Sequence, residues 1–251
     1  FNFDTHAGEN HIWTLSEPYG ARRWWPCKDD PSDKADSMDI IITVPADQIV
    51  ASNGLLVNEI ELGDGRKQYH WEERYPICTY LVSVTSYPYL VWGDTYVSMD
   101  GDTMPIVFYN YPDQVAIADD NYLLTKDMIG AFAQRFGEYP FINEKYGHAD
   151  FGRGGGMEHQ TLSSMGGHSQ WLIAHELGHQ WWGDLLTCAS FHHIWLNEGF
   201  ARYCEAIWEE SHNGVDAYKS YWESHTFYGP GTIYVEDPSS VGQIFNGNLS
   251  Y

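Results

Sequence analysis

Two histidines four residues apart, with a glutamate beside the first, most constrain what this chain can fold into. The segment is His175-Glu176-Leu177-Gly178-His179, and Glu198 follows it after nineteen residues. Residues four apart on an α-helix share one face, so the two imidazoles point to one place. Two neutral imidazoles and a carboxylate are a common ligand set for a catalytic zinc ion, whose fourth position stays open for water. The spacing therefore predicts a site for one zinc ion, held by His175, His179 and Glu198.

Glu176 stands beside the predicted metal and is not needed as a ligand. Zinc lowers the pKa of a bound water from about 16 to about 7 and polarises a bound carbonyl group. A free carboxylate beside the metal can then take the proton of the water and pass it to a leaving amine. We therefore predict that Glu176 is the general base of a hydrolytic reaction.

A chance occurrence of the motif on a solvated helix is the alternative, because the chain holds 12 His and 35 acidic residues. An apolar stripe of Ala174, Leu177 and Trp181 argues against it, because residues at i, i+3 and i+7 would pack this helix onto a core. A second helix, predicted over about residues 193–210, carries Glu198. The ligand set would then come from two helices joined by a loop and a turn.

Glu205 follows Glu198 by seven residues, which is two helical turns along the same face. There its carboxylate could accept the outer N–H of a zinc histidine and fix the ring. An exposed helix glutamate is the alternative. His192 and His193 lie near the motif but outside the ligand spacing, and we expect them to be polar lining of the site.

Composition bounds the class of protein. At 251 residues, with 43% hydrophobic content, the chain can bury a large core and is long enough for two domains. No run of about 18 apolar residues occurs, so the sequence predicts no transmembrane segment. The formal net charge of -22 argues against nucleic acid as a partner, because its phosphates would be repelled. Solubility or salt adaptation is the simpler explanation of that charge.

The four cysteines show no metal or redox spacing; they are Cys27, Cys78, Cys188 and Cys204. Disulfides and buried free thiols are both compatible with this pattern, so the compartment stays open. The chain begins at Phe1 without methionine and ends at Tyr251, just after a turn-like Asn246-Gly247-Asn248. We therefore expect a fragment or a processed chain.

Short apolar or alternating runs fill the first third of the chain and predict an antiparallel sheet with hairpins; they are residues 38–44, 48–52, 55–60, 68–73 and 79–86. Turn residues such as Asn53-Gly54 separate them. The character changes near Gly93-Asp94, where a strand over 105–109 precedes an amphipathic helix over about 113–136. We predict an α+β chain with two domains that pack directly, residues 1–93 and 94–251, the first incomplete at its start and the second truncated at its end.

A second constellation, Gly154-Gly155-Gly156-Met157-Glu158-His159, lies between a short predicted strand and the zinc helix. Glycines let a backbone approach a ligand closely and lend amide and carbonyl groups to the edge of a substrate peptide. Glu158 could hold a cation there. A plain glycine loop is the alternative, and the position shortly before His175 favours the functional interpretation.

Together these motifs resemble the zinc aminopeptidase family that includes aminopeptidase N and the leukotriene hydrolases, the gluzincin metallopeptidases. The resemblance rests on Gly155-Gly156-Met157-Glu158, on the histidine motif with Trp181-Trp182-Gly183-Asp184, and on Trp195-Leu196-Asn197-Glu198-Gly199-Phe200-Ala201. The N-terminal part agrees, since Trp24-Trp25-Pro26-Cys27 and Ser52-Asn53-Gly54 resemble the saddle-shaped β-domain of that family. The match runs over nearly the whole chain.

The resemblance implies a thermolysin-like catalytic domain and a role for further residues. Glu158 would hold the free α-amine of a peptide substrate, and Glu17 would assist it. Gly155 and Gly156 would line the peptide backbone. The tyrosine that stabilises the oxyanion in the family would be Tyr251.

Three departures from the family pattern stand in this sequence. The usual Asn after the motif glutamate is His159, and a common Gln two residues before Glu17 is Leu15. Both alter the lining of the amine site. The chain also ends at Tyr251, before the Lys-Gly that follows this tyrosine in the family and before the family's later helical domains.

The predicted function is therefore zinc-dependent removal of N-terminal residues from peptides with a free N-terminus. A thermolysin-like endopeptidase would share the zinc ligands but has no use for a paired carboxylate anchor. A non-catalytic zinc scaffold or peptide-binding module is the third class. The sequence leaves the oligomeric state and the preferred first residue open.

Overall fold

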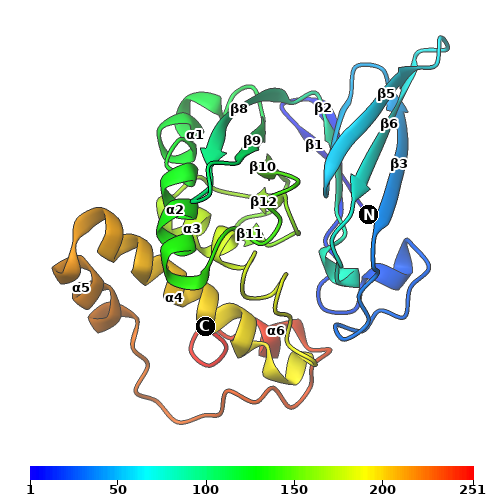
Figure 1. The fold of residues 1–251 in the computed structure, drawn as a ribbon. Coiled ribbons are helices and arrows are strands. Elements are labelled where there is room, and N and C mark those ends of the chain that lie inside the picture. Colours follow the sequence, from blue (N-terminus) through cyan, green and yellow to red (C-terminus); the bar gives the residue numbers. More distant parts are fainter.

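Antiparallel strands form the first third of the chain. The structure is a computed structural model that describes residues 1–251, except the side chain of Asp119. One sheet has the order β1-β2-β7-β4, formed by Asn2–His6, Glu9–Trp13, Val84–Tyr87 and Ile49–Ser52. Another has the order β3-β6-β5, formed by Met38–Pro45, Arg66–Glu73 and Leu55–Glu61. Figure 1 shows both sheets in blue and cyan, with the β5–β6 hairpin projecting from the molecule.

Alternation of side chains explains why this region forms sheets. In β6, Tyr69, Trp71 and Glu73 are buried while the residues between them are less so. Ile40 and Val44 of β3 share the same core as Trp71. The predicted strand over 79–86 is only partly right, because Thr79–Leu81 form a 3-10 helix and β7 begins at Val84. All three residues of that 3-10 turn are buried, so this apolar run lacks the alternation of a strand.

A mixed sheet follows, with the order β11-β12-β10-β9-β8, formed by Gly156–Met157, Ser163–Met165, Tyr146–Asp150, Thr103–Asn110 and Leu90–Val97. β10 pairs in parallel with both β9 and β12, while β11 pairs antiparallel with β12. The short glycine strand β11 therefore lies at one edge of this sheet. The predicted boundary at 93/94 falls within β8, which pairs along its length with β9, and the division into two domains stays a prediction.

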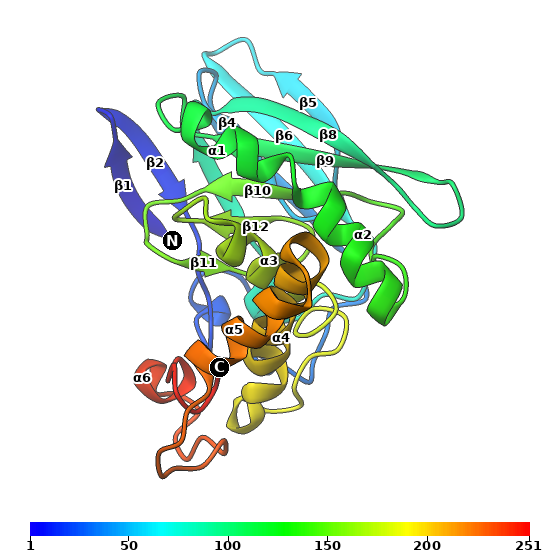
Figure 2. The ribbon, with the colours of Figure 1, turned by 90° about the vertical axis from the view of Figure 1, so that its left-hand side faces the viewer.

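The α-helices all follow β9 in the chain, and the first two of them cover one side of the mixed sheet (Figure 2). The helices are α1 Val115–Tyr122, α2 Thr125–Phe136, α3 Gln170–Gly178, α4 Trp195–Asn213, α5 Val215–His225 and α6 Val241–Ile244, with further 3-10 turns at Ala21–Arg23 and Phe191–His193. The single helix predicted over about 113–136 is in fact α1 and α2. The amide of Leu124 donates to Asn121 O, a tighter bond than the α-helical one, and this turn separates the two helices.

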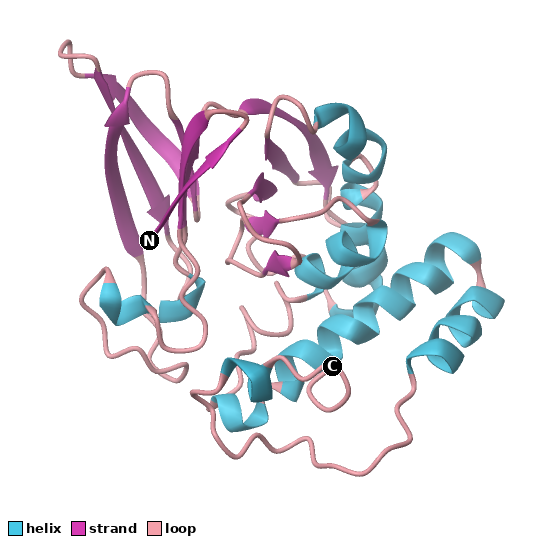
Figure 3. Ribbon diagram, turned by 180° about the vertical axis from the view of Figure 1, so that it is seen from behind, coloured by secondary structure: helices cyan, strands magenta, loops and turns pink.

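The fold is thus α+β, as the sequence predicts. Figure 3 shows the strands gathered on one side and the helices on the other, with the mixed sheet between them. The four cysteines are free, and all but Cys27 are buried. Among the helices that the structure describes, none combines the length and the apolar character of a membrane-spanning segment.

Candidate active site

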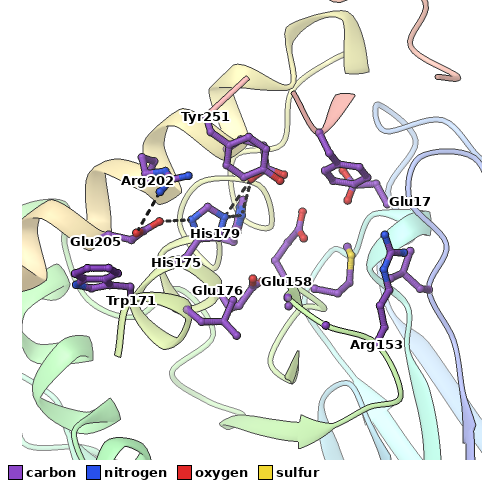
Figure 4. Close-up of a pocket in the computed structure, with 18 residues that line it drawn as sticks. Glu17, Arg153, Glu158, Trp171, His175, Glu176, His179, Arg202, Glu205 and Tyr251 are labelled. Atoms are coloured by element: carbon purple, nitrogen blue, oxygen red, sulfur yellow. Dashed lines mark hydrogen bonds and ion pairs between the residues drawn. The ribbon is translucent and has the colours of Figure 1, made fainter. Parts of the chain in front are cut away.

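Helix α3 and its C-cap residue carry the histidine motif, and a capping hydrogen bond and core packing fix the helix in place. Its N-cap Ser169 accepts a hydrogen bond from the amide of Leu172. The predicted apolar stripe of Ala174, Leu177 and Trp181 is buried in the core beneath the mixed sheet and α2. His179 follows the last residue of α3 and keeps a helical conformation. Both histidines therefore face the same cavity (Figure 4).

The outer ring nitrogens of the two histidines are bound to acceptors. His175 Nδ1 lies 2.8 Å from Glu205 Oε1, and His179 Nδ1 lies 3.0 Å from the carbonyl oxygen of Trp182. Neither partner has a hydrogen to give when Glu205 is ionised, so each Nδ1 carries the proton. In the neutral rings each Nε2 then presents a lone pair.

Three lone pairs converge at the inner side of the motif. The two Nε2 atoms are 3.2 Å apart, and Glu198 Oε2 lies 3.2 Å from that of His175 and 3.4 Å from that of His179. Ligands about 2.0 to 2.2 Å from a tetrahedral metal ion lie about 3.3 to 3.6 Å from one another. Both the donor types and their separations therefore fit a metal ion such as zinc.

Glu205 ties the ring of His175 to helix α5. Its second oxygen, Oε2, accepts a hydrogen bond of 2.9 Å from the hydroxyl of Tyr221 and lies 3.6 Å from Arg202 Nη1. Glu205 is buried, so the alternative of an exposed helix glutamate is wrong. The spacing of two helical turns places Glu198 and Glu205 of α4 against the same histidine.

Glu176 lies between the histidines and the glycine strand. A Cβ atom on Gly156 would overlap its carboxylate, so only glycine leaves room for it there. Burial raises the pKa of Glu176 to about 8, while His175 and His179 act in the opposite direction. A metal cation at the two imidazoles would likewise favour the ionised form.

The glycine strand offers one free edge to the cavity. Gly156 and Met157 pair with Met165 and Ser164 of β12 on one side. Their other side lies along the cavity, together with Gly154 and Gly155. Such an edge can bind an extended peptide through main-chain hydrogen bonds.

Two further carboxylates lie close to His175, His179 and Glu198, which we call the metal-ligand set. Oxygen atoms of Glu17, Glu158 and Glu198 lie within 4.8 Å of one another, and all three residues are buried. Among the described residues neither oxygen of Glu17 has a hydrogen-bond partner. Burial and the charge of Glu158 raise the pKa of Glu17 well above its ordinary value, and burial also raises the pKa of Glu158. A cation placed among these oxygens would relieve the repulsion.

The ring of Tyr251 stacks on that of His175, a member of the metal-ligand set. The two ring centres lie 5.6 Å apart at an interplanar angle of 16°, and the guanidinium of Arg202 lies 5.6 Å from the centre of the tyrosine ring. Burial and the nearby Glu198 raise the pKa of Tyr251 above its ordinary value, so the hydroxyl keeps its proton and can donate a hydrogen bond. Figure 4 shows Tyr251 above the histidines.

One cavity of about 450 Å³ brings together the predicted metal-ligating, catalytic, substrate-binding and ring-orienting residues; they are Glu17, Gly155, Gly156, Glu158, His175, Glu176, His179, Glu198, Glu205 and Tyr251. Leu15 also lines it, whereas His159 is buried and bonds Ser164. The expectation that His192 and His193 line the site is wrong. Neither histidine is among the described residues that line the cavity, and both rings pack against Tyr234 instead.

Several residues of the site have no signal of their own in the sequence. The hydroxyl of Tyr80 donates to Glu158 Oε1 at 3.4 Å and accepts from Asn197 Nδ2 at 3.1 Å. These bonds link the part of the chain from β1 to β7, called the β-rich region below, to helix α4. Tyr80 is 78 residues from Glu158 in the sequence. No local spacing could predict that contact. Asn197 is recognisable in the sequence only as part of a longer motif.

Comparison with known proteins now decides the family. The model of the peptidase M1 N-terminal domain matches residues 2–81, and that of the peptidase family M1 domain matches residues 156–241. This chain belongs to peptidase family M1. The resemblance stated from its motifs is thereby confirmed.

Relatives and solved structures agree with this assignment. Glutamyl aminopeptidase of Sus scrofa is 29% identical over 95% of this chain, and endoplasmic reticulum aminopeptidase 2 of Bos taurus is 32% identical over 82% of it. A two-domain M1 zinc metallopeptidase mutant bound to L-tryptophan superposes with a TM-score of 0.83, 29% identity and 98% of this chain covered. The chain spans 28% and 23% of the two relatives and 57% of that solved chain.

Proposed function

We propose that this M1 chain is a zinc-dependent aminopeptidase that removes N-terminal residues from peptides. The observation that carries the proposal is the pair of buried carboxylates, Glu17 and Glu158, beside the three converging metal donors. The M1 zinc metallopeptidases and aminopeptidases among its relatives support the same interpretation. An endopeptidase would need the metal site alone.

His175, His179 and Glu198 would hold the zinc ion, and Glu205 would orient His175. Zinc bound there supplies Lewis acidity, which polarises the scissile carbonyl and lowers the pKa of water. The Nδ1 contacts keep both rings in the tautomer that presents Nε2 inward.

Glu176 would act as the general base. Its Oε2 atom is buried and has no hydrogen-bond partner among the described residues, so it is free to accept the proton of the attacking water. The same carboxyl then gives that proton to the nitrogen of the leaving amine. Gly156 keeps the space that this carboxylate occupies.

Glu158 and Glu17 would bind the free α-ammonium of the substrate. The edge of β11 would hold the following peptide backbone, so the first peptide carbonyl lies over the metal donors. This arrangement would select the first peptide bond, because an anchored α-ammonium fixes which carbonyl reaches the metal donors. The hydroxyl of Tyr251 would donate a hydrogen bond to the oxyanion that forms on the carbonyl oxygen.

The ligand assignment predicts that the protein binds about one zinc ion and that His179→Ala or Glu198→Ala removes most of it. Metal content after dialysis, measured by mass spectrometry, checks this. His212→Ala changes an exposed histidine of α4 and is the control, expected to keep its zinc. Full zinc in both ligand variants would show that the metal binds elsewhere.

A base that is not a ligand leaves a distinct kinetic signature. Glu176→Gln should keep zinc and substrate affinity while it lowers kcat by roughly 100-fold or more, because only proton transfer is lost. Steady-state kinetics with an aminoacyl-arylamide measures both constants. Activity within a few-fold of the parent would mean that another group takes the proton.

Tyr251→Phe tests the oxyanion contact. It should lower kcat by about 100- to 1000-fold with little change in KM, since the hydrogen bond forms in the transition state. The same arylamide assay reports it. An unchanged kcat would remove Tyr251 from the catalytic residues.

Glu158→Ala tests the amine anchor. A charge-assisted contact of about 1.5 to 3 kcal/mol is lost, so kcat/KM for substrates with a free amine should fall roughly 10- to 100-fold or more. Zinc content should stay at the parent value, because Glu158 is not among the three metal donors. A loss of zinc, or no loss of kcat/KM, would contradict the assignment.

A further inference from the structure

The turn Asn53-Gly54 of the β-rich region contacts the segment that carries Glu158. Asn53 is fully buried, and its Nδ2 donates to the carbonyl oxygen of Gln160 at 2.6 Å and to that of Leu81 at 3.0 Å. Its Oδ1 accepts from the amide of Ser83 at 2.7 Å. One side chain thus joins the two stretches of chain that flank the Glu158 carboxylate.

Those two stretches both lead directly to Glu158. Gln160 is two residues beyond it, and the turns in between are tight, with His159 N bonded to Met157 O at 2.9 Å. Leu81 is next to Tyr80, whose hydroxyl is the one that donates to Glu158 Oε1. Movement of Asn53 would therefore shift both the backbone and the hydrogen-bond partner of Glu158.

Gly54 makes the second link from the same turn. Its amide donates to Thr161 Oγ1 at 2.8 Å. A Cβ atom on Gly54 would overlap the carbonyl of Glu72, and its φ of +70° suits glycine, so this close approach requires the residue that is there.

Thr161 is held in a conformation that a β-branched residue rarely adopts, with a φ of +63°. The hydroxyl oxygen, the carbonyl oxygen and the amide of Thr161 each form a hydrogen bond with a neighbouring residue. Lys145 Nζ donates to its carbonyl oxygen at 3.1 Å, and its own amide donates to Gln180 Oε1 at 2.8 Å. Gln180 directly follows the metal-ligand candidate His179. Thr161 therefore joins the β-rich turn to the end of the histidine motif.

We propose that the Asn53-Gly54 turn, acting through Thr161, positions Glu158 against the metal-ligand set and so sets the affinity of the site for the amine of the substrate. This inference rests on the proposed function. Neither Asn53 nor Thr161 lines the cavity among its described residues, so they are positioning residues. The β-rich region thereby contributes to amine recognition beyond the carboxylate of Glu17.

The test measures how much the α-amine of a ligand adds to its affinity for the site. Dissociation constants for L-leucine hydroxamic acid and for its des-amino analogue, 4-methylpentanohydroxamic acid, are determined by calorimetry on the zinc-loaded full chain. The parent should bind the amine form at least about tenfold more tightly. Thr161→Val keeps the shape but removes Oγ1, which accepts from the amide of Gly54 at 2.8 Å and from Lys145 Nζ at 3.5 Å. It should reduce that ratio to about twofold or less. Affinity for the des-amino analogue and zinc content should stay the same.

Matched variants separate positioning from general damage. Thr161→Ser retains the hydroxyl and should restore most of the ratio. Thr125→Val makes the same change at a buried threonine of α2 and should keep the parent ratio. Asn53→Ala removes the other link, should lower the ratio in the same direction, and decides the matter if Thr161→Val does not fold.

Failure of the proposed function and failure of the role of the turn give different results. A parent ratio near one would overturn the proposed function, since the site would then have no amine anchor. A clear parent preference that Thr161→Val and Asn53→Ala both keep in full would overturn only the role of the turn. In a Glu158→Ala background, Thr161→Val should add less than about a twofold effect, because the anchor it positions is gone.

Discussion

The concentration of buried negative charge around one cavity is the constraint on which the rest of this structure depends. Glu17, Glu158, Glu176, Glu198 and Glu205 all line it and are all buried. An ionised carboxylate taken out of water costs several kcal/mol unless a cation or hydrogen bonds offset it. Here a metal ion at the two neutral imidazoles and a substrate ammonium are the cations that the geometry can receive. Positive charges placed at this site would therefore stabilise it.

Elements from both ends of the chain contribute residues to this cavity. Helices α3 and α4 bring the metal donors together, and Tyr221 of α5 holds Glu205 in place. The edge strand β11 lies beside them because β12 and β10 place it there. The β-rich region supplies Glu17, Tyr80 and the Asn53-Gly54 turn. The proposed amine anchor thus lies where the β-rich region meets the mixed sheet, and it would respond to a change in how they pack.

Local spacing predicted the parts of the site that lie on one helix face. The histidine motif, Glu176 and the position of Glu205 on α4 follow from helical periodicity, and the α+β class follows from alternation and apolar stripes. Glu17 and Tyr251 came from family resemblance, because nothing near them in sequence shows where they meet the histidines. Tyr80, Gln180 and the Thr161 contact could not be predicted, since each joins segments far apart in the chain. The break between α1 and α2 was missed because one tight turn at Leu124 leaves the apolar pattern intact.

The central claim is that one site combines a metal centre with an anchor for a free amine. Hydrolysis of a panel of aminoacyl-arylamides, compared with the same compounds carrying an N-acetyl group, tests it most directly when each is measured with and without a chelator. The account predicts that the free-amine compounds are cleaved, that chelation abolishes cleavage and zinc restores it, and that the acetylated compounds stay intact. Comparable cleavage of the acetylated compounds, or activity that survives removal of the metal, would contradict it.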